Sequence, residues 1–388
     1  MLPLSLYVHF PWCVKKCPYC DFNSHETKVI PKAEYVNALM DDLRYEAAKV
    51  EGRKLHSIFF GGGTPSLFEA KYVGALLDEV ERQIGFNDDI EITLEVNPGT
   101  SEYDNLAGYR AAGVNRLSFG VQSFDDIQLE KLGRIHRSAE VTKAVKDARK
   151  GGFDNINLDL MYGLSGQNAG QAQRDLQLAF DLEPEHVSWY QLTIEPNTAF
   201  YSRPPTLPDD DALADIQVLG FDALAAAGYK QYEVSAYAKV GKESRHNLNY
   251  WMFGDYLAIG AGAHGKVTNS FTKFVQQAKN ELEILRYRKS RKPADYIFQQ
   301  GDKTLGNVRV NESSQILEFM MNSLRLVDGV PADLFFERTS LSHSAISELD
   351  GKIRELEEKG LMCDWPNRIQ CTKLGFQFLN TVLGYFEG

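Results

Sequence analysis

Residues 13–20 read Cys13-Val-Lys-Lys-Cys17-Pro-Tyr-Cys20, directly after the apolar run 4–10 that predicts a first strand. Three thiols this close together on one loop can direct their sulfurs to a single point. The other two cysteines, Cys363 and Cys371, lie far away in the sequence, so we do not expect a disulfide framework. The stretch therefore predicts a site for a metal or an iron–sulfur cluster.

Three interpretations fit such a loop. A cubane iron–sulfur cluster needs four ligands, usually thiolates, so three cysteines leave one iron open to another group. A zinc site also uses short cysteine spacings, and His9 or His25 would then supply the fourth ligand. Unpaired structural thiols are the third interpretation. The stretch alone leaves these alternatives open.

The composition excludes several classes of protein. With 42 basic and 53 acidic residues the net charge is −11, which argues against a protein that follows nucleic-acid phosphates and against a generally basic membrane-binding face. No apolar run approaches the ~20 residues needed to cross a bilayer. The first strand is expected within a few residues of Met1, which leaves no room for a signal or transit peptide. Thiolates also suit a reducing compartment, so we expect a cytoplasmic location.

Short β-branched and aromatic runs alternate with amphipathic stretches in the first part of the chain, which is typical of βα units on a parallel sheet. The predicted strands are Ser5–Phe10, His56–Phe60, Ile90–Val96, Arg116–Val121, Asn155–Met161 and Val187–Ile194. The predicted helices include Lys32–Val50, Leu67–Ile84, Ser138–Lys150, Gln171–Asp181 and Asp211–Ala227. The fold class is therefore α/β, a partial barrel of six βα units. Ligands of such barrels gather at the carboxyl ends of the strands.

The pattern changes near Gly228. Tyr229–Ser235 predicts one more strand, followed by an aromatic, glycine-rich segment over 246–266 and a charged, helix-prone segment over 267–304. We expect domain boundaries at 1–237, 238–304 and 305–388.

The last domain is predicted to be a small α+β unit. From about residue 307 we expect two helices, a helix over Asp350–Gly360, a hairpin over Leu361–Thr372 that turns at residues 366–367, and a last helix that ends at Phe386. This order is typical of a winged-helix-like domain, and its wing is not basic, which favours packing or docking over nucleic-acid binding. Cys363 and Cys371 are expected to face each other across the hairpin as buried or half-buried small residues.

Polar residues and glycines follow the predicted strands. Gly61-Gly62-Gly63-Thr64-Pro65 comes after the second strand, where glycines allow either a close approach to a ligand or a tight turn. Glu95 ends the third strand and suits either a ligand cation or a helix cap. Gln122 ends the fourth strand and offers both a donor and an acceptor.

Two charged residues extend this set. Arg134 can hold a carboxylate through two hydrogen bonds, although it can also be an ordinary surface arginine. Asp159 lies in an apolar predicted strand, where an acid is costly unless it has a partner. That placement favours a functional role.

The spacing of the three cysteines after a first strand resembles the signature of the radical S-adenosylmethionine (SAM) superfamily. The resemblance extends over nearly the whole chain through Tyr-Val-His-Phe-Pro-Trp-Cys, Cys-Pro-Tyr-Cys-Asp-Phe, Gly-Gly-Gly-Thr-Pro-Ser, Glu-Val-Asn-Pro-Gly, Gly-Val-Gln-Ser-Phe and Asn-Leu-Asp-Leu-Met-Tyr-Gly-Leu. This set is similar to the oxygen-independent coproporphyrinogen III oxidases and to the haem chaperones related to them. Ser165 departs from the expected Gly-Leu-Pro and concerns only a turn.

The resemblance implies cofactors and ligands. It implies a 4Fe–4S cluster on Cys13, Cys17 and Cys20, with the amino and carboxylate groups of SAM on the open iron. In the superfamily the reduced cluster can cleave SAM to a 5′-deoxyadenosyl radical. By the same resemblance the SAM site would be lined by Tyr7, Tyr19, Gly62, Gly63, Thr64, Glu95, Gln122, Arg134 and Asp159. Whether one SAM or two bind stays open.

Two features favour the chaperones over the oxidases. The oxidases carry a further cysteine two residues after the third ligand, where this chain has Phe22. Residues 246–251, His246-Asn-Leu-Asn-Tyr-Trp251, resemble the His-Asn-x-x-Tyr-Trp motif of the chaperones, whose histidine is implicated in haem binding. We therefore predict His246 as an axial haem ligand, with the aromatic rings of Tyr250 and Trp251 packed on the macrocycle.

The alternatives for this motif are a histidine held within the core, and His264 as a second candidate that more simply serves backbone packing. The resemblance implies a haem chaperone that passes haem to apo-haemoproteins, above all membrane-bound cytochromes, with peripheral contact at the inner face of the membrane. The rival functions are oxidative decarboxylation of coproporphyrinogen III and a zinc-stabilised barrel that only binds.

Overall fold

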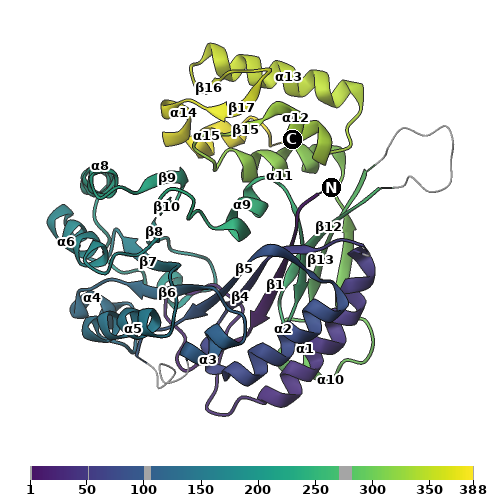
Figure 1. Cartoon of the computed structure of the whole chain (residues 1–388). Helices are drawn as coiled ribbons and strands as arrows, with labels where there is room; N and C mark the ends of the chain where they lie inside the picture. The colour runs from purple at the N-terminus through teal and green to yellow at the C-terminus, as the bar shows by residue number, and fades with distance from the viewer. Residues whose placement is uncertain (1, 51, 100–105, 271–281, 388) are drawn as a thin grey trace.

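The computed structural model describes residues 2–50, 52–99, 106–270 and 282–387, and its main feature is one 12-stranded sheet (Figure 1). Six neighbouring strands run parallel and form the partial barrel: β1 (Leu4–Phe10), β4 (Leu55–Gly62), β5 (Phe86–Val96), β6 (Arg116–Gln122), β7 (Ile156–Tyr162) and β8 (His186–Gln191). The predicted α/β class and its six βα units are confirmed.

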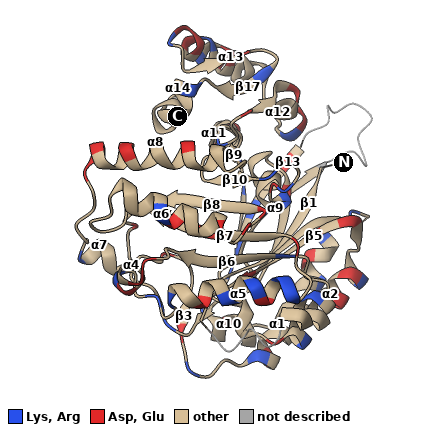
Figure 2. Ribbon diagram, turned by 60° about the vertical axis from the view of Figure 1, so that its left-hand side comes forward, with Lys and Arg blue, Asp and Glu red and all other residues tan. Residues whose placement is uncertain are grey.

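Helices cover the outer face of these strands (Figure 1). They are α1 (Lys32–Ala47), α2 (Ala70–Gln83), α3 (Leu106–Ala111), α4 (Asp126–Lys131), α5 (Ser138–Lys150), α6 (Ala169–Phe180) and α8 (Asp210–Ala226), with 3₁₀ turns at Ala48–Val50 and Pro65–Leu67. The short helix α7 (Ala199–Ser202) contacts the cysteine loop instead, since the N–H of Phe200 donates to Pro18 O at 2.9 Å. Charged side chains lie mostly on this outer layer, whereas the strands carry few of them (Figure 2). Each charged residue inside the barrel therefore requires its own explanation.

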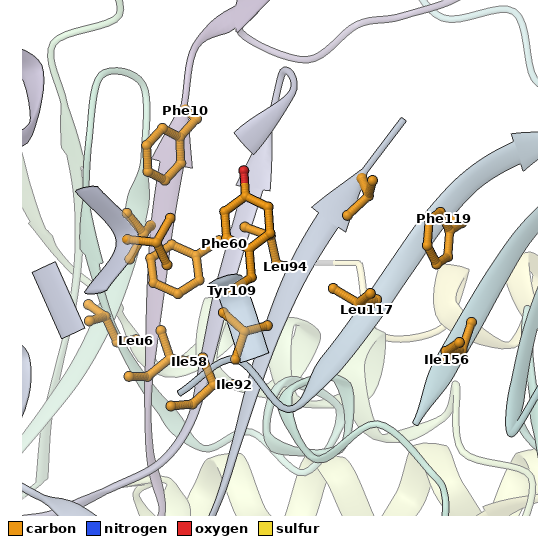
Figure 3. Close-up of a cluster of buried hydrophobic side chains, with 14 of the residues drawn as sticks. Leu6, Phe10, Ile58, Phe60, Ile92, Leu94, Tyr109, Leu117, Phe119 and Ile156 are labelled. Atoms are coloured by element: carbon orange, nitrogen blue, oxygen red, sulfur yellow. The ribbon is translucent and has the colours of Figure 1, made fainter. Parts of the chain in front are cut away.

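The two faces of each strand differ because successive side chains point to opposite sides. In β1, Leu6, Val8 and Phe10 are buried and lie on the outward, helix-covered face, in the cluster that Figure 3 shows. The residues between them include Ser5, whose Oγ lies 2.6 Å from Ser57 Oγ of β4. The strands thus bury an apolar layer under the helices and direct polar side chains into the barrel.

The sheet continues beyond β1 with strands that the sequence did not predict. The strand β11 (Asp255–Ile259) pairs parallel with β1, and β12 (His264–Ser270), β13 (Leu282–Lys289) and β14 (Thr304–Arg309) follow antiparallel. The helix α10 (Pro293–Phe298) is the one helix of the described part of 267–304. The prediction of a helix-prone segment is therefore wrong for β13 and β14, and residues 271–281 lie outside the described residues.

The reason is long-range pairing of charged side chains that by themselves favour helix. Lys289 of β13 is fully buried, and its Nζ lies 2.7 Å from Asp42 Oδ1 and 2.6 Å from Glu46 Oε1, both of α1. Buried charges require partners in such positions. These partners become available only when β13 joins the sheet beside α1.

At the other end of the sheet lie β10 (Ala236–Ala238) and the edge strand β9 (Lys230–Glu233), which confirms the strand predicted over Tyr229–Ser235. The helix α9 (Arg245–Trp251) follows and lies between the sheet and the C-terminal domain (Figure 1). The edge of β9 pairs with the C-terminal domain, since Val234 donates its backbone N–H to Arg325 O at 3.1 Å.

The C-terminal domain has its own core and a three-stranded sheet in the order β15-β17-β16. Its elements are α11 (Glu312–Ser323), β15 (Val330–Pro331), α12 (Ala332–Arg338), α13 (His343–Glu358), β16 (Met362–Cys363), β17 (Arg368–Cys371), α14 (Lys373–Gln377) and α15 (Leu379–Gly384). The predicted α+β unit is confirmed, although α13 begins earlier than expected because Ser342 caps it by accepting the N–H of Ala345.

The two hairpin cysteines are not directly opposite each other, contrary to the prediction. Cys371 pairs with Met362, and Cys363 pairs with Gln370. Adjacent positions of a strand point to opposite faces, which is why Cys371 is buried and Cys363 is half-buried. None of the helices in the part of the chain that the structure describes is long and apolar enough to cross a membrane.

Candidate functional site

A cavity of about 630 Å³ opens at the carboxyl ends of the barrel strands. Its wall combines the cysteine loop, the glycine run, the ends of β5 to β8, and β9 with α9. The lining residues that the argument uses are Cys13, Cys17, Cys20, Tyr19, Phe22, Gly62, Gly63, Thr64, Glu95, Asn97, Gln122, Arg134, Asp159, Tyr190, Glu233, Asn247 and Trp251. The structure thus brings most of the predicted site residues together.

The cysteine loop is closed at its base by backbone pairing. The strands β2 (Trp12–Cys13) and β3 (His25–Glu26) run side by side, and the N–H of His25 donates to Pro11 O at 2.7 Å. Lys16 ties the two halves of the loop together, because its Nζ donates to Phe22 O at 3.1 Å and to Ser24 O at 3.3 Å. The loop is therefore held in place by hydrogen bonds that do not involve its thiols.

The three thiols suit a cluster better than a single zinc ion. Among the described residues, only Asp42, Glu46 and Asp302 form a group of three ligand residues whose atoms all lie within 4.8 Å of one another, so at least one pair of the three sulfurs is farther apart than that. A tetrahedral zinc with bonds of about 2.3 Å needs sulfurs about 3.8 Å apart, whereas a cubane binds each thiolate at a different iron.

The surroundings of the thiols differ from one to the next. Burial raises the pKa of the Cys13 and Cys20 thiols. The Arg134 guanidinium donates from Nη1 to Cys17 Sγ at 3.8 Å. The loop therefore places one thiol beside a fixed positive charge.

The glycine run, residues 61–63, and Thr64 hydrogen bond to the backbone that leads into the cysteine loop. The N–H of Gly63 donates to Phe10 O and that of Thr64 to Trp12 O, both at 2.7 Å. A Cβ at Gly63 would lie 2.4 Å from Trp12 O, and Gly62 has a φ of +113°, which only glycine adopts without strain. Glycine is thus required here because two backbone segments lie in contact. From the sequence, the glycines were expected to allow a close approach to a ligand or a tight turn.

Two acids face the cavity from β5 and β7. Burial, and then the charge of Asp159, raises the pKa of Glu95 to about 8, although the N–H of Gly62 donates to Glu95 Oε2 at 3.2 Å. Burial also raises the pKa of Asp159, which accepts from Ser118 Oγ at 2.9 Å and from Asn157 Nδ2 at 2.8 Å. Neither acid has a lysine or arginine within 4.0 Å among the described residues, so both suit a cationic ligand.

Opposite these acids lie a cation and an amide. Arg134 Nη2 donates to Asn97 Oδ1 at 2.7 Å and to Gly120 O at 2.6 Å, while its Nε is buried without a hydrogen-bond partner among the described residues. Gln122 has a φ of 68° and accepts from Tyr190 OH at 2.8 Å. The arrangement fixes both side chains at the cavity wall.

His246, the predicted haem ligand, is buried in the core, which was the alternative considered for this motif. It is 3% exposed, its Nδ1 lies 3.3 Å from Ser57 Oγ, and its ring stacks on Phe59 at 5.0 Å between centroids. Burial lowers its pKa to about 3, so the imidazole is neutral. Its own helix instead directs Asn247 and Trp251 into the cavity.

Among the predicted site residues, Tyr7 also lies outside the cavity lining. Its hydroxyl lies 2.9 Å from His9 Nδ1, and burial raises the pKa of Tyr7. His9 Nε2 lies 2.8 Å from Asn23 O, so both ring nitrogens are occupied and His9 is unsuited to bind zinc. His264, the second histidine considered for haem, is exposed on β12.

Sequence reasoning missed Tyr190 and Glu233 as cavity residues. Tyr190 lies near the end of β8, where the rule that ligands gather at strand ends would have found it. Glu233 lies in β9, an edge strand without a local motif, so no sequence signal indicated it.

Comparison with protein families matches residues 7–179 to the Radical SAM superfamily and residues 311–378 to the HemN C-terminal domain. The chain is 48% identical to the haem chaperones HemW of Haemophilus influenzae and Escherichia coli, in each case over 99% of this chain and 98% of the relative. It is 36% identical to the haem chaperone HemW of Bacillus subtilis, over 99% of each chain.

The solved structure of coproporphyrinogen III oxidase HemN from Escherichia coli shares the fold, with a TM-score of 0.81 at 24% identity, over 99% of this chain and 90% of that one. Membership of the radical SAM superfamily implies a 4Fe–4S cluster and SAM as cofactors. The structure supplies three thiols and a polar cavity for them. The chain therefore belongs to the HemW family of the radical SAM superfamily.

Proposed function

We propose that this protein is a haem chaperone that holds a 4Fe–4S cluster on Cys13, Cys17 and Cys20, binds SAM in the adjoining cavity, and passes haem to apo-haemoproteins. The observation that carries the proposal is the single cavity that the cysteine loop and two residues of α9, Asn247 and Trp251, line together. The name haem chaperone that the relatives carry supports it.

The charges of the cavity fit SAM. SAM carries a sulfonium and an ammonium group as well as a carboxylate. Glu95 and Asp159 offer two buried acids for the cations, and a nearby cation would lower the pKa of Glu95 from about 8. Arg134 keeps a free buried Nε–H for the carboxylate. When bound, a reduced cluster supplies an electron to SAM; the residues of this chain hold and orient both groups.

We propose His246 as the axial haem ligand, although it is packed between Ser57 and Phe59. Coordination then requires α9 to move away from β4. The neutral imidazole suits this role, because a metal binds the unprotonated nitrogen. Trp251, at the end of the same helix, would lie against the macrocycle.

The acceptors in this proposal are apo-haemoproteins, in particular membrane-bound cytochromes, and the protein would meet them at the inner face of the membrane. The second candidate, oxidative decarboxylation of coproporphyrinogen III, shares the scaffold. Phe22, 62% exposed at the cavity edge, stands where the oxidases carry a cysteine. This substitution favours the chaperone.

The deciding experiment uses anaerobically reconstituted protein with the cluster, SAM and a reductant. Coproporphyrinogen III is added, and protoporphyrinogen and 5′-deoxyadenosine are followed by chromatography; in parallel, haem-loaded protein is mixed with an apo-cytochrome. Haem transfer without porphyrinogen conversion supports the proposal. Conversion of the porphyrinogen would make the protein an oxidase.

A second experiment tests His246. We expect H246A to weaken haem binding at least tenfold and to keep the iron content of the cluster. The matched control is H264A, since His264 is exposed and lies outside the cavity lining. Equal haem affinity for H246A and the wild type would remove His246 as the ligand.

A further inference from the structure

An ion pair joins the wall of the cavity to the C-terminal domain. Glu233 of β9 lines the cavity, and its Oε2 accepts from Nη2 of Arg325, in the C-terminal domain, at 3.0 Å. Backbone hydrogen bonds hold the two segments together, from Val234 N to Arg325 O and from Val327 N to Tyr232 O, both at 3.1 Å. Arg325 therefore has a fixed position beside the cavity wall.

Two buried donors in this cluster have no acceptor. The guanidinium carbon of Arg325 lies 4.4 Å from the centroid of the Trp251 ring, and Trp251 itself lines the cavity. Arg325 Nε and Trp251 Nε1 are both buried without a hydrogen-bond partner among the described residues. A buried N–H without an acceptor is costly, so such pairs are rare unless a ligand completes them.

The two donors indicate which kind of chemical group would bind there. An indole N–H only donates, and a guanidinium donates through a planar fork that matches a carboxylate. Glu233 occupies only one N–H of Arg325, and its other oxygen accepts from Ser235 N at 3.0 Å. The cluster therefore suits an anionic acceptor such as a carboxylate.

We propose that Nε of Arg325 and Nε1 of Trp251 form a carboxylate subsite that takes a propionate of haem, while Glu233 holds the guanidinium through Nη2 and places a negative charge beside the propionate. This inference rests on the proposed haem binding and adds a recognition residue from the C-terminal domain. It predicts opposite effects for the two partners of the ion pair. Loss of Arg325 removes the propionate contact, whereas loss of the Glu233 charge removes a like charge beside the propionate.

The test is a titration of the wild type and its variants with haem and with haem dimethyl ester, whose propionates are uncharged, followed by the Soret absorbance. We expect R325Q to bind haem about tenfold more weakly and the ester as the wild type does, because one charge-assisted hydrogen bond is lost. E233Q should bind haem severalfold more tightly. R354Q is the matched control, since Arg354 is an exposed arginine of the same domain that pairs with Asp350.

The outcomes separate the two proposals. Wild-type protein that binds haem and its ester equally, or R325Q that keeps the wild-type preference for haem, would overturn the subsite alone. Wild-type protein that binds no haem would overturn the proposed function and the subsite with it. If R325Q does not fold, R325K keeps the charge without the fork, and we expect it to lose part of the preference for haem; an unchanged preference would overturn the subsite.

Discussion

Two parts of the cavity wall differ in how they are held: the cysteine end, formed by the cysteine loop and the glycine run, and the other end, formed by α9 and β9. At the cysteine end, the loop and the glycine run are short stretches that hydrogen bond to each other through their backbones. At the other end, α9 depends on Glu91, which accepts the N–H of His246 at 3.0 Å across 155 residues of sequence. The first end joins the segments that follow two adjacent strands, β1 and β4, whereas the second requires α9 to pack against β5 from far away in the sequence. Four variants test this difference.

The largest effect is expected at the cysteine end. C17S should abolish the cluster, seen as loss of bound iron and of visible absorbance after anaerobic reconstitution, and should leave the fold intact by far-ultraviolet circular dichroism. The reason is that the loop is closed by backbone hydrogen bonds that do not involve the sulfur. The control is C363S, a half-buried thiol of the hairpin. Global unfolding of C17S would show that the metal holds the fold.

G63A should lower the free energy of unfolding by about 3 kcal/mol, because its methyl group would meet Trp12 O at 2.4 Å and push the cysteine loop away. Urea unfolding of the cluster-free protein measures this. The control is G351A in α13, where a Cβ meets nothing within 4 Å and should stabilise the helix by about 1 kcal/mol. A neutral G63A would contradict the close contact between the two backbones.

E91Q should weaken α9 by about 1–2 kcal/mol, since Glu91 accepts the N–H groups of Arg245 and His246 and the hydroxyl of Ser244. Hydrogen exchange should then be faster in α9 and unchanged in the helices of the barrel. E140Q is the control, because Glu140 caps α5 at the surface. Equal protection of α9 in E91Q and the wild type would contradict its dependence on Glu91.

The last variant tests a dependence of stability on pH. The pKa of His246 is about 3 in the folded protein because of burial, below its ordinary value of 6.5, so between these values the unfolded state binds one more proton. Stability from the neutral imidazole is present above pH 6.5 and is lost as the pH falls. We expect the difference in unfolding free energy between wild type and H246L to shrink by about 1.4 kcal/mol per pH unit from pH 6 to 4. A constant difference would mean that His246 is hydrated in the folded protein.

The sequence by itself determined the barrel and the cysteine end. Alternation along β1 and its neighbours separates apolar outward residues from polar inward ones, and the carboxyl ends of parallel strands meet at one edge of a sheet. Spacing and order therefore marked Cys13, Glu95, Gln122 and Asp159 as candidates, and the resemblance to the radical SAM superfamily assigned them to one site. These signals lie in short stretches of sequence, so they can be recognised without knowledge of the fold.

The arrangement of α9, β9 and the C-terminal domain at the other end could be known only from the tertiary structure. His246 is buried on Ser57 and Phe59, while its neighbour Asn247 faces the cavity, although both belong to one predicted motif. Glu233 and Arg325 meet because the C-terminal domain pairs with β9, and β13 becomes a strand because Lys289 finds its acids on α1. The physical reason is the same in each case. Burial and charge pairing depend on residues far away in the chain. A local sequence pattern does not show which of those distant residues will make the contact.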